Sequence, residues 1–127
     1  MIGRMKRFWM ILAGALLLSA CGTQGTAVYN HLGNVVGSVR VDDDNHATIF
    51  NDGNESIGTL NGKIVHAQKR RAGQVTDNKI LDIRRKEIGT VVDGTDCYNA
   101  SGMRVGRLSS VINPEAAGGA CLLLLLQ

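Results

Sequence analysis

Residues 28–39 read VYNHLGNVVGSV, and the same pattern of residue types returns four times further along the chain without a gap. The other copies are residues 49–60, 64–75, 80–91 and 97–108. The tenth position is glycine in every copy: Gly37, Gly58, Gly73, Gly89 and Gly106. The ninth and twelfth positions are apolar, and the second position holds every aromatic residue beyond residue 21: Tyr29, Phe50 and Tyr98. A fixed pattern of this kind indicates an architecture of repeated structural units.

Each copy predicts a β-hairpin, because Val, Ile, Thr, Tyr and Phe bracket a polar middle such as residues 30–34 or 51–55. Further turn signals lie between the copies: Asn61 with Gly62, Asp77 with Asn78, and Asp93 with Gly94. Short connections make neighbouring strands antiparallel, and one hairpin alone cannot bury its apolar face. We therefore expect an all-β domain over residues 28–127, with five β-hairpin repeats arranged around a pseudo-five-fold axis and no exposed sheet edge.

The repeated glycine has a structural explanation. In a regular strand the ninth and twelfth positions would face opposite sides, so two apolar residues at that spacing indicate a bulge, a sharp bend or a close backbone approach between them. The alternative is a plain twisted strand with a small residue facing the axis. Both interpretations make the glycine structural rather than catalytic.

These five units resemble the small bacterial five-fold β-flower family, in which hairpin petals surround a central axis. The resemblance covers residues 26–127 and includes the apolar C-terminal run. It implies a fold and no established activity. The third unit departs from the pattern, with His66 and Ala72 where the other units have Asn or Asp and Val or Ile.

The tail consists of Cys121, five consecutive leucines at residues 122–126, and Gln127. Five leucines are too few to cross a bilayer, and exposed to water they would favour aggregation. A continuous apolar run is typical of a strand that is buried on both faces. We predict an apolar strand packed in the core and reached through a loop at residues 113–119, the alternative being a second membrane contact or a hook for a partner.

Residues 1–20 resemble a bacterial lipoprotein signal peptide. A basic start (Arg4, Lys6, Arg7) precedes an apolar stretch at residues 8–18, too short to span a membrane, and a lipobox at residues 18–21 that ends in Cys21. We expect lipid on Cys21 and a short linker at residues 21–27. We also expect export to a membrane. If the host is Gram-negative, Gly22 after the cysteine favours the outer membrane. The alternatives are an ordinary secretory signal and an uncleaved anchor.

Charge and composition limit the classes of function. The chain has 14 basic and 11 acidic residues, but three of the basic residues lie in the leader, so the remainder is balanced and nucleic acid is not an expected partner. A content of 44% hydrophobic and 20% charged residues excludes a wholly disordered chain and a polytopic membrane protein. Beyond the leader, Cys97 and Cys121 could form one disulfide in an oxidising compartment or remain two buried thiols.

Residues that could carry chemistry are few, and no metal or cofactor motif is present. The acidic run at residues 42–45 lacks the spacing of a calcium loop and predicts a solvated connection. A basic cluster falls in matching turns of the third and fourth units, either as ordinary solvated charge or as a patch for an anionic lipid or polymer: Lys69, Arg70, Arg71, Arg84, Arg85 and Lys86. The third position of each unit is polar: Asn30, Asn51, His66, Asp82 and Asn99. These side chains could form a polar ring around the axis, or each could begin its own turn.

Two hypotheses about function follow. The first is a lipid-anchored cell-envelope protein that acts as a structural or interaction module, with an envelope protein or polymer as partner and no catalytic activity. The second is a small hydrolase-like envelope enzyme, or a ligand-binding lipoprotein, that uses His66 and neighbouring carboxylates. An enzyme would require a cleft with convergent titratable groups.

Overall fold

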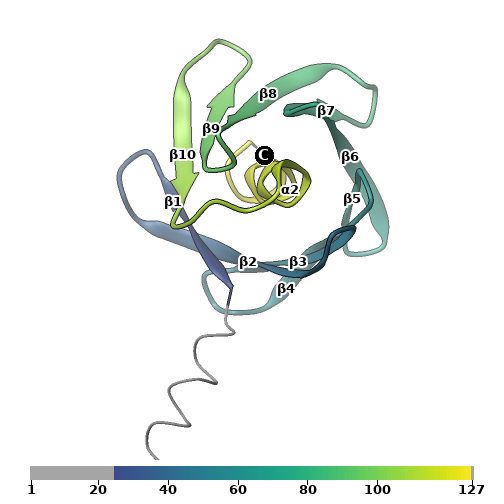
Figure 1. Ribbon diagram of the computed structural model, residues 1–127, viewed down its shortest axis with the longest axis horizontal. Helices are drawn as coiled ribbons and strands as arrows, with labels where there is room; N and C mark the ends of the chain where they lie inside the picture. Colours follow the sequence, from purple (N-terminus) through teal and green to yellow (C-terminus); the bar gives the residue numbers. More distant parts are fainter. Residues whose placement is uncertain (1–24, 127) are drawn as a thin grey trace, which may run out of the picture.

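The computed structural model describes residues 25–126 as a closed antiparallel β-barrel around one C-terminal helix. In Figure 1 the strands form a ring, and helix α2 lies inside it and is seen end-on. The ten strands are β1 Thr26–Asn30, β2 Val35–Asp43, β3 His46–Asn51, β4 Ser56–Asn61, β5 Ile64–Ala67, β6 Arg70–Thr76, β7 Lys79–Asp82, β8 Glu87–Val92, β9 Asp96–Asn99 and β10 Arg104–Leu108. Helix α2 is Pro114–Leu124. The prediction of an all-β wall with no open edge is confirmed.

Each strand pairs with its neighbours in sequence, and β1 closes the ring by pairing with β10. The hairpins are therefore β1–β2, β3–β4, β5–β6, β7–β8 and β9–β10, called hairpins 1 to 5 below. Their turns all lie at one end of the barrel, residues 30–35, 51–56, 67–70, 82–87 and 99–104, and we call these turns and the strand residues beside them the turn end. The connections between hairpins lie at the opposite end, residues 43–46, 61–64, 76–79, 92–96 and 109–113, and we call them and the strand residues beside them the link end. The chain enters β1 at the link end, because Thr26 pairs with Val39 and its hydroxyl lies 3.0 Å from the Ser110 hydroxyl.

Inside the wall, each hairpin contributes two buried apolar side chains and one glycine at equivalent positions, and hairpin 2 adds the buried Ala47. The buried apolar residues at the equivalent positions are Val28, Val39, Ile49, Leu60, Val65, Val75, Ile80, Val91, Cys97 and Leu108. Beside the first of each pair, the ladder changes register by one residue, as between Val28 and Tyr29. The predicted bulge is therefore present in every hairpin.

The repeated glycines, called the wall glycines below, also make the predicted close backbone approach. A Cβ on Gly37 would overlap the Phe50 carbonyl oxygen of hairpin 2. The other four wall glycines meet the carbonyl oxygen of the next hairpin in the same way: Gly58 with His66, Gly73 with Leu81, Gly89 with Tyr98, and Gly106 with Tyr29. Any side chain at these positions would push two paired strands apart.

The prediction of an apolar core strand at the tail is wrong in its secondary structure, and so is the expectation of a loop at residues 113–119. The segment forms α2, and Ala116 to Leu122 are all buried. A lone strand inside a closed barrel would leave its N–H and C=O groups without partners, whereas a helix satisfies them internally. A capping signal was present in the sequence: Asn113 is the N-cap and accepts a 2.8 Å hydrogen bond from Ala116 N–H, and Pro114 follows at the first helical position.

Leucines 122–126 pack against the wall glycines, one leucine to each hairpin. Leu122 lies against Gly73, Leu123 against Gly58, Leu124 against Gly37, Leu125 against Gly106 and Leu126 against Gly89. Successive residues of a helix point about 100° apart, so a run of leucines reaches around the ring where an amphipathic pattern would reach only one side. Leu122 is buried and Leu123 to Leu126 are half-buried, at the turn end of the barrel. We call α2 together with residues 125–126 the plug.

The rest of the plug is built from small residues because the wall side chains fill much of the interior. A Cβ on Gly118 would lie 2.7 Å from both methyl groups of Val75. A disulfide joins Cys121 of the plug to Cys97 of β9, with the two Cα atoms 6.1 Å apart. The plug is thus held by packing around the ring and by one covalent bond.

Candidate functional site

Four of the five polar residues of the predicted ring, all except His66, form hydrogen bonds within their own turns. In hairpin 1, the Asn30 side-chain oxygen accepts hydrogen bonds of 2.9 and 3.0 Å from the backbone N–H groups of Leu32 and Asn34. The same pair of bonds, to the residues two and four positions on, recurs at Asn51, Asp82 and Asn99. These oxygens stabilise the turns, a role typical of Asn and Asp.

Hairpin 3 lacks this turn, and the gapless alignment of its sequence is wrong by one residue. Val65 pairs with Gly73, eight residues away, whereas Val28 pairs with Gly37, nine residues away. His66 therefore occupies the place that Tyr29 has in hairpin 1, and Ala67 occupies the place of Asn30. The turn of hairpin 3 has two residues and begins with Gln68 at φ +60°. His66 does not belong to the polar ring.

The ladder neighbours of His66 are Thr59 on β4 and Arg71 on β6. Within residues 25–126, no hydrogen bond or ion pair joins His66 to a carboxylate. The described part of the chain also contains no group of three or more His, Cys, Asp or Glu side chains that could hold a metal ion. The enzyme hypothesis gains no support from this placement of His66.

The predicted basic cluster lies at the turn end, where hairpins 3 and 4 are neighbours because β6 pairs with β7. All six cations are exposed, and none forms an ion pair with the residues that the structure describes. A shallow groove of about 350 Å³ between the two hairpins is lined by Arg70, Arg71, Asp82 and Ile83, among others. The hydrogen bond from Lys86 N–H is the main cause of a lowered pKa of Asp82. Burial acts in the opposite direction, and the Arg84 N–H bond and the nearby positive charges lower the pKa further, so this carboxylate is held as an anion within its turn.

Four apolar side chains are exposed at the turn end, a feature that the sequence pattern did not single out. Val35 is 50% exposed, and three others are more exposed. Leu32 is 71% exposed, Ile83 is 61% exposed and Met103 is 64% exposed. They lie in the turns of hairpins 1, 4 and 5, which are consecutive around the ring. The link end also exposes apolar side chains, those of Val41, Val92 and Val111. Exposed apolar residues grouped at an end of a small domain commonly mark a contact surface.

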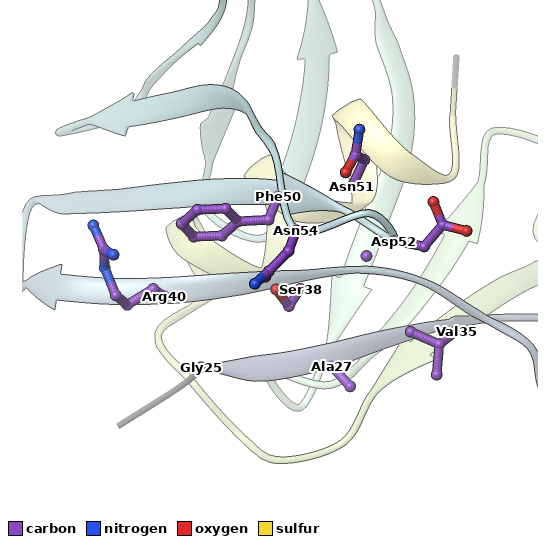
Figure 2. Close-up of a pocket in the computed structure, with 10 residues that line it drawn as sticks. Gly25, Ala27, Val35, Ser38, Arg40, Phe50, Asn51, Asp52 and Asn54 are labelled. Atoms are coloured by element: carbon purple, nitrogen blue, oxygen red, sulfur yellow. The ribbon is translucent and has the colours of Figure 1, made fainter. Parts of the chain in front are cut away.

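A larger groove, of about 520 Å³, lies between hairpins 1 and 2. Figure 2 shows Phe50 and Asn54 between Arg40 at one end of the groove and Asp52 at the other. Arg40 donates a 2.8 Å hydrogen bond to Asp42 Oδ1, and its guanidinium lies 5.4 Å from the centre of the Phe50 ring. The two grooves share three equivalent positions: Val35, Asn51 and Asp52 occupy the places that Arg71, Asp82 and Ile83 have in the groove between hairpins 3 and 4.

The acidic run at residues 42–45 forms the connection between β2 and β3 at the link end. Asp43 Oδ1 lies 2.9 Å from His46 Nδ1 and also accepts the Asn45 N–H at 2.8 Å. The Asn45 N–H bond, followed by the bond to His46, lowers the pKa of Asp43. Both side chains of the Asp43–His46 pair are more than half exposed, so this connection is solvated.

The predicted signal peptide at residues 1–20 and the lipidated Cys21 lie outside the residues that the structure describes, as does most of the predicted linker at residues 21–27. Within residues 25–126, no helix combines the length and the apolar character that a membrane crossing requires. Searches of family models, curated proteins and solved structures give no match to the chain.

Proposed function

We propose that the protein is a lipid-anchored module of the cell envelope, held at a membrane through Cys21 and presenting the barrel as a structural or interaction unit without catalysis. The observation that carries the proposal is the sequence at residues 18–21, where a basic and apolar leader ends in Leu, Ser, Ala and Cys21 shortly before the barrel begins. In a Gram-negative host, Gly22 after the cysteine favours the outer membrane.

The geometry of the barrel supports an anchor at that position. Gly25, the first described residue, lies at the link-end side of β1, where a Cβ on it would meet the Val39 carbonyl oxygen. Cys21 precedes Gly25 by four residues, which span at most about 14 Å when extended. An anchor at Cys21 would therefore hold the link end toward its membrane and direct the turn end away from it. The turn end, with its cations and projecting apolar residues, would then be exposed to the other components of the envelope, and the side of the wall would remain open to a protein or polymer partner.

We also propose that the five hairpins are one repeated unit in a pseudo-five-fold arrangement, as the resemblance to the β-flower family implies. Three features that recur in every hairpin support this: the register shift, the wall glycine under the next hairpin's carbonyl oxygen, and the contact with one leucine of the plug. Units that are related by symmetry place equivalent residues in equivalent environments. The one-residue shortening of hairpin 3 changes its turn and leaves these three features in place.

The anchor is tested by Cys21→Ala in the full chain, with Gly22→Ala as a matched control that changes the neighbouring residue and keeps the acceptor thiol. We expect the first variant to accumulate unprocessed or to leave the membrane fraction, and the control to fractionate like the original protein. A Cys21→Ala protein that is membrane-bound and has the mature mass would overturn the proposal.

A further inference from the structure

The two ends of the barrel carry opposite charge. The turn end has seven cations: Lys69, Arg70, Arg71, Arg84, Arg85, Lys86 and Arg104. Its four carboxylates are Asp52, Glu55, Asp82 and Glu87. The link end has three cations, Arg40, Lys63 and Lys79, against seven carboxylates: Asp42, Asp43, Asp44, Asp77, Asp93, Asp96 and, in the first turn of α2, Glu115. Arg104 of the turn end reaches Asp96 in a 3.5 Å ion pair, so these two charges offset each other. A chain with no net charge beyond its leader is thus a dipole, and an anion would approach it from the turn end.

Within the turn end, the positive charge is concentrated on hairpins 3 and 4. Six of the seven cations lie there, exposed and without ion-pair partners among the described residues. Of the carboxylates nearby, Asp82 accepts the N–H groups of Arg84 and Lys86 through its Oδ1 and forms no ion pair with these cations. The guanidinium and ammonium groups therefore remain available to phosphate oxygens, for which arginine has a matching geometry.

The apolar residues of the turn end decide between the anions that could bind. Ile83 directly precedes Arg84 in the turn of hairpin 4, and Met103 and Leu32 project from the next two turns around the ring. The half-buried leucines 123–126 lie inside the same end. A soluble polymer of phosphates offers nothing to these side chains, whereas the interface of a bilayer accepts apolar side chains below its headgroups and cations among them.

We propose that the turn end docks onto an anionic phospholipid surface, with the cations of hairpins 3 and 4 on the headgroup phosphates and Ile83, Met103 and Leu32 in the interface. This docking does not require the lipid anchor. One consequence rests on the proposed function. If the anchor at Cys21 holds the link end at one membrane, the surface that the turn end docks onto is a second membrane facing the first, and the barrel bridges the two.

The test uses the full chain, synthesised without export so that its leader is retained, and tethered to beads through an N-terminal affinity tag so that the turn end faces the solution. The probes are vesicles of phosphatidylcholine alone and vesicles in which about a third of the lipid is phosphatidylglycerol, and the readout is the amount of vesicle captured. Arg84→Gln with Arg85→Gln removes two turn-end cations, and Lys63→Gln with Lys79→Gln is the control that makes the same change of charge at the link end. The leader is the same in all variants, so its own affinity for lipid cancels in the comparison.

We expect the original chain to prefer the anionic vesicles, and the turn-end variant to bind them roughly 25-fold more weakly, since each of its two lost cations changes affinity about fivefold near a charged bilayer. The link-end variant should bind like the original chain, and Ile83→Ser should weaken capture while leaving the charge unchanged. Equal binding by the two double variants would overturn the proposal. Capture of soluble polyphosphate as strong as that of vesicles, together with no effect of Ile83→Ser, would instead assign the face to a polymer. Neither result depends on the fate of Cys21→Ala, so the docking and the anchor fail separately.

Discussion

The wall and the plug of the barrel both use glycine against the same interior, but different neighbours make the small residue necessary. Each wall glycine lies under a backbone carbonyl oxygen of the adjoining hairpin, and Gly118 of the plug lies against the methyl groups of Val75. A backbone oxygen in a hydrogen-bonded ladder cannot move without separating two strands, whereas a side chain can in principle repack. Gly119, one residue further along the helix, has only ordinary contacts, the nearest being 3.5 Å from a Cβ to Val65. The comparison therefore ranks the glycines by how rigid the neighbouring atom is.

The largest effect is expected where wall and plug meet, at the leucines of the tail. Deletion from residue 122 onward removes one buried and four half-buried leucines, and full burial of a leucine contributes about 1.5–3 kcal/mol. Because a domain of this size has a total stability of about 5–15 kcal/mol, we expect the truncated chain to lose its cooperative thermal transition. The measurement is the melting curve by circular dichroism.

Leu32→Ser is the matched control for the deletion, since Leu32 is 71% exposed at the tip of hairpin 1. This variant should melt within about 0.5 kcal/mol of the original stability, as most surface substitutions do. If the truncated chain melts like the full chain, the plug does not hold the wall together, and the account of the wall glycines as partners of the leucines fails.

A smaller loss is expected from one methyl group in the wall. Gly58→Ala places a Cβ against the His66 carbonyl oxygen and a methyl group of Leu123, so the ladder between hairpins 2 and 3 and the plug must both shift. Overpacking a close contact costs about 1–3 kcal/mol, and a backbone partner places the cost toward the upper end. Denaturant unfolding measures this loss of stability.

Gly53→Ala is the control: this glycine lies in the turn of the same hairpin, and its Cβ would meet only the Asn51 side chain, at 3.4 Å. If Gly53→Ala lowered the stability as much as Gly58→Ala, the general cost of replacing glycine by alanine, rather than the contacts of Gly58, would determine the loss of stability.

The wall was predictable from the sequence because its constraints repeat. Five copies at aligned positions average out the irregularity of each one, and the glycine, the flanking apolar residues and the Asn or Asp of the turn all recur. The plug occurs once, so its pattern had no copies to support it, and its two adjacent glycines, Gly118 and Gly119, are unfavourable for an isolated helix. The small residues are required because the wall side chains leave little space around the helix. This requirement comes from tertiary packing, and local helix propensity does not reflect it. The capping signal at Asn113 and Pro114 was the local sign of the helix.

Hairpin 3 shows the limit of the repeat argument. The gapless alignment kept Gly73 in its column and misplaced His66, since the missing residue lies in the turn and the glycine comes after it. The same limit applies to the surface. The basic cluster was visible in the sequence, but the exposure of Ile83, Met103 and Leu32 was not, because a turn residue can point toward the barrel or away from it and the sequence pattern is the same in both cases.

The smallest and most selective prediction compares two adjacent glycines of the plug. Alanine is more favourable than glycine inside a helix by about 1 kcal/mol, and α2 contains both residues at buried positions. At Gly119 the added methyl group finds Val65, Ile49 and Leu60 at 3.5–3.9 Å, which is ordinary contact distance, so Gly119→Ala should stabilise the protein by up to about 1 kcal/mol. At Gly118 the same methyl group would lie 2.7 Å from two atoms of Val75, a stiff, fully buried side chain, so the clash should exceed the gain and Gly118→Ala should destabilise. The two variants differ only in position, and denaturant midpoints at equal slope give the sign of each change in stability.

Stabilisation at both positions would show that Val75 repacks freely, and the wall would then be less rigid than its ladder implies. Losses at both would show that the plug has no spare room on any side, so its small residues would be required around the whole helix rather than on the face toward Val75.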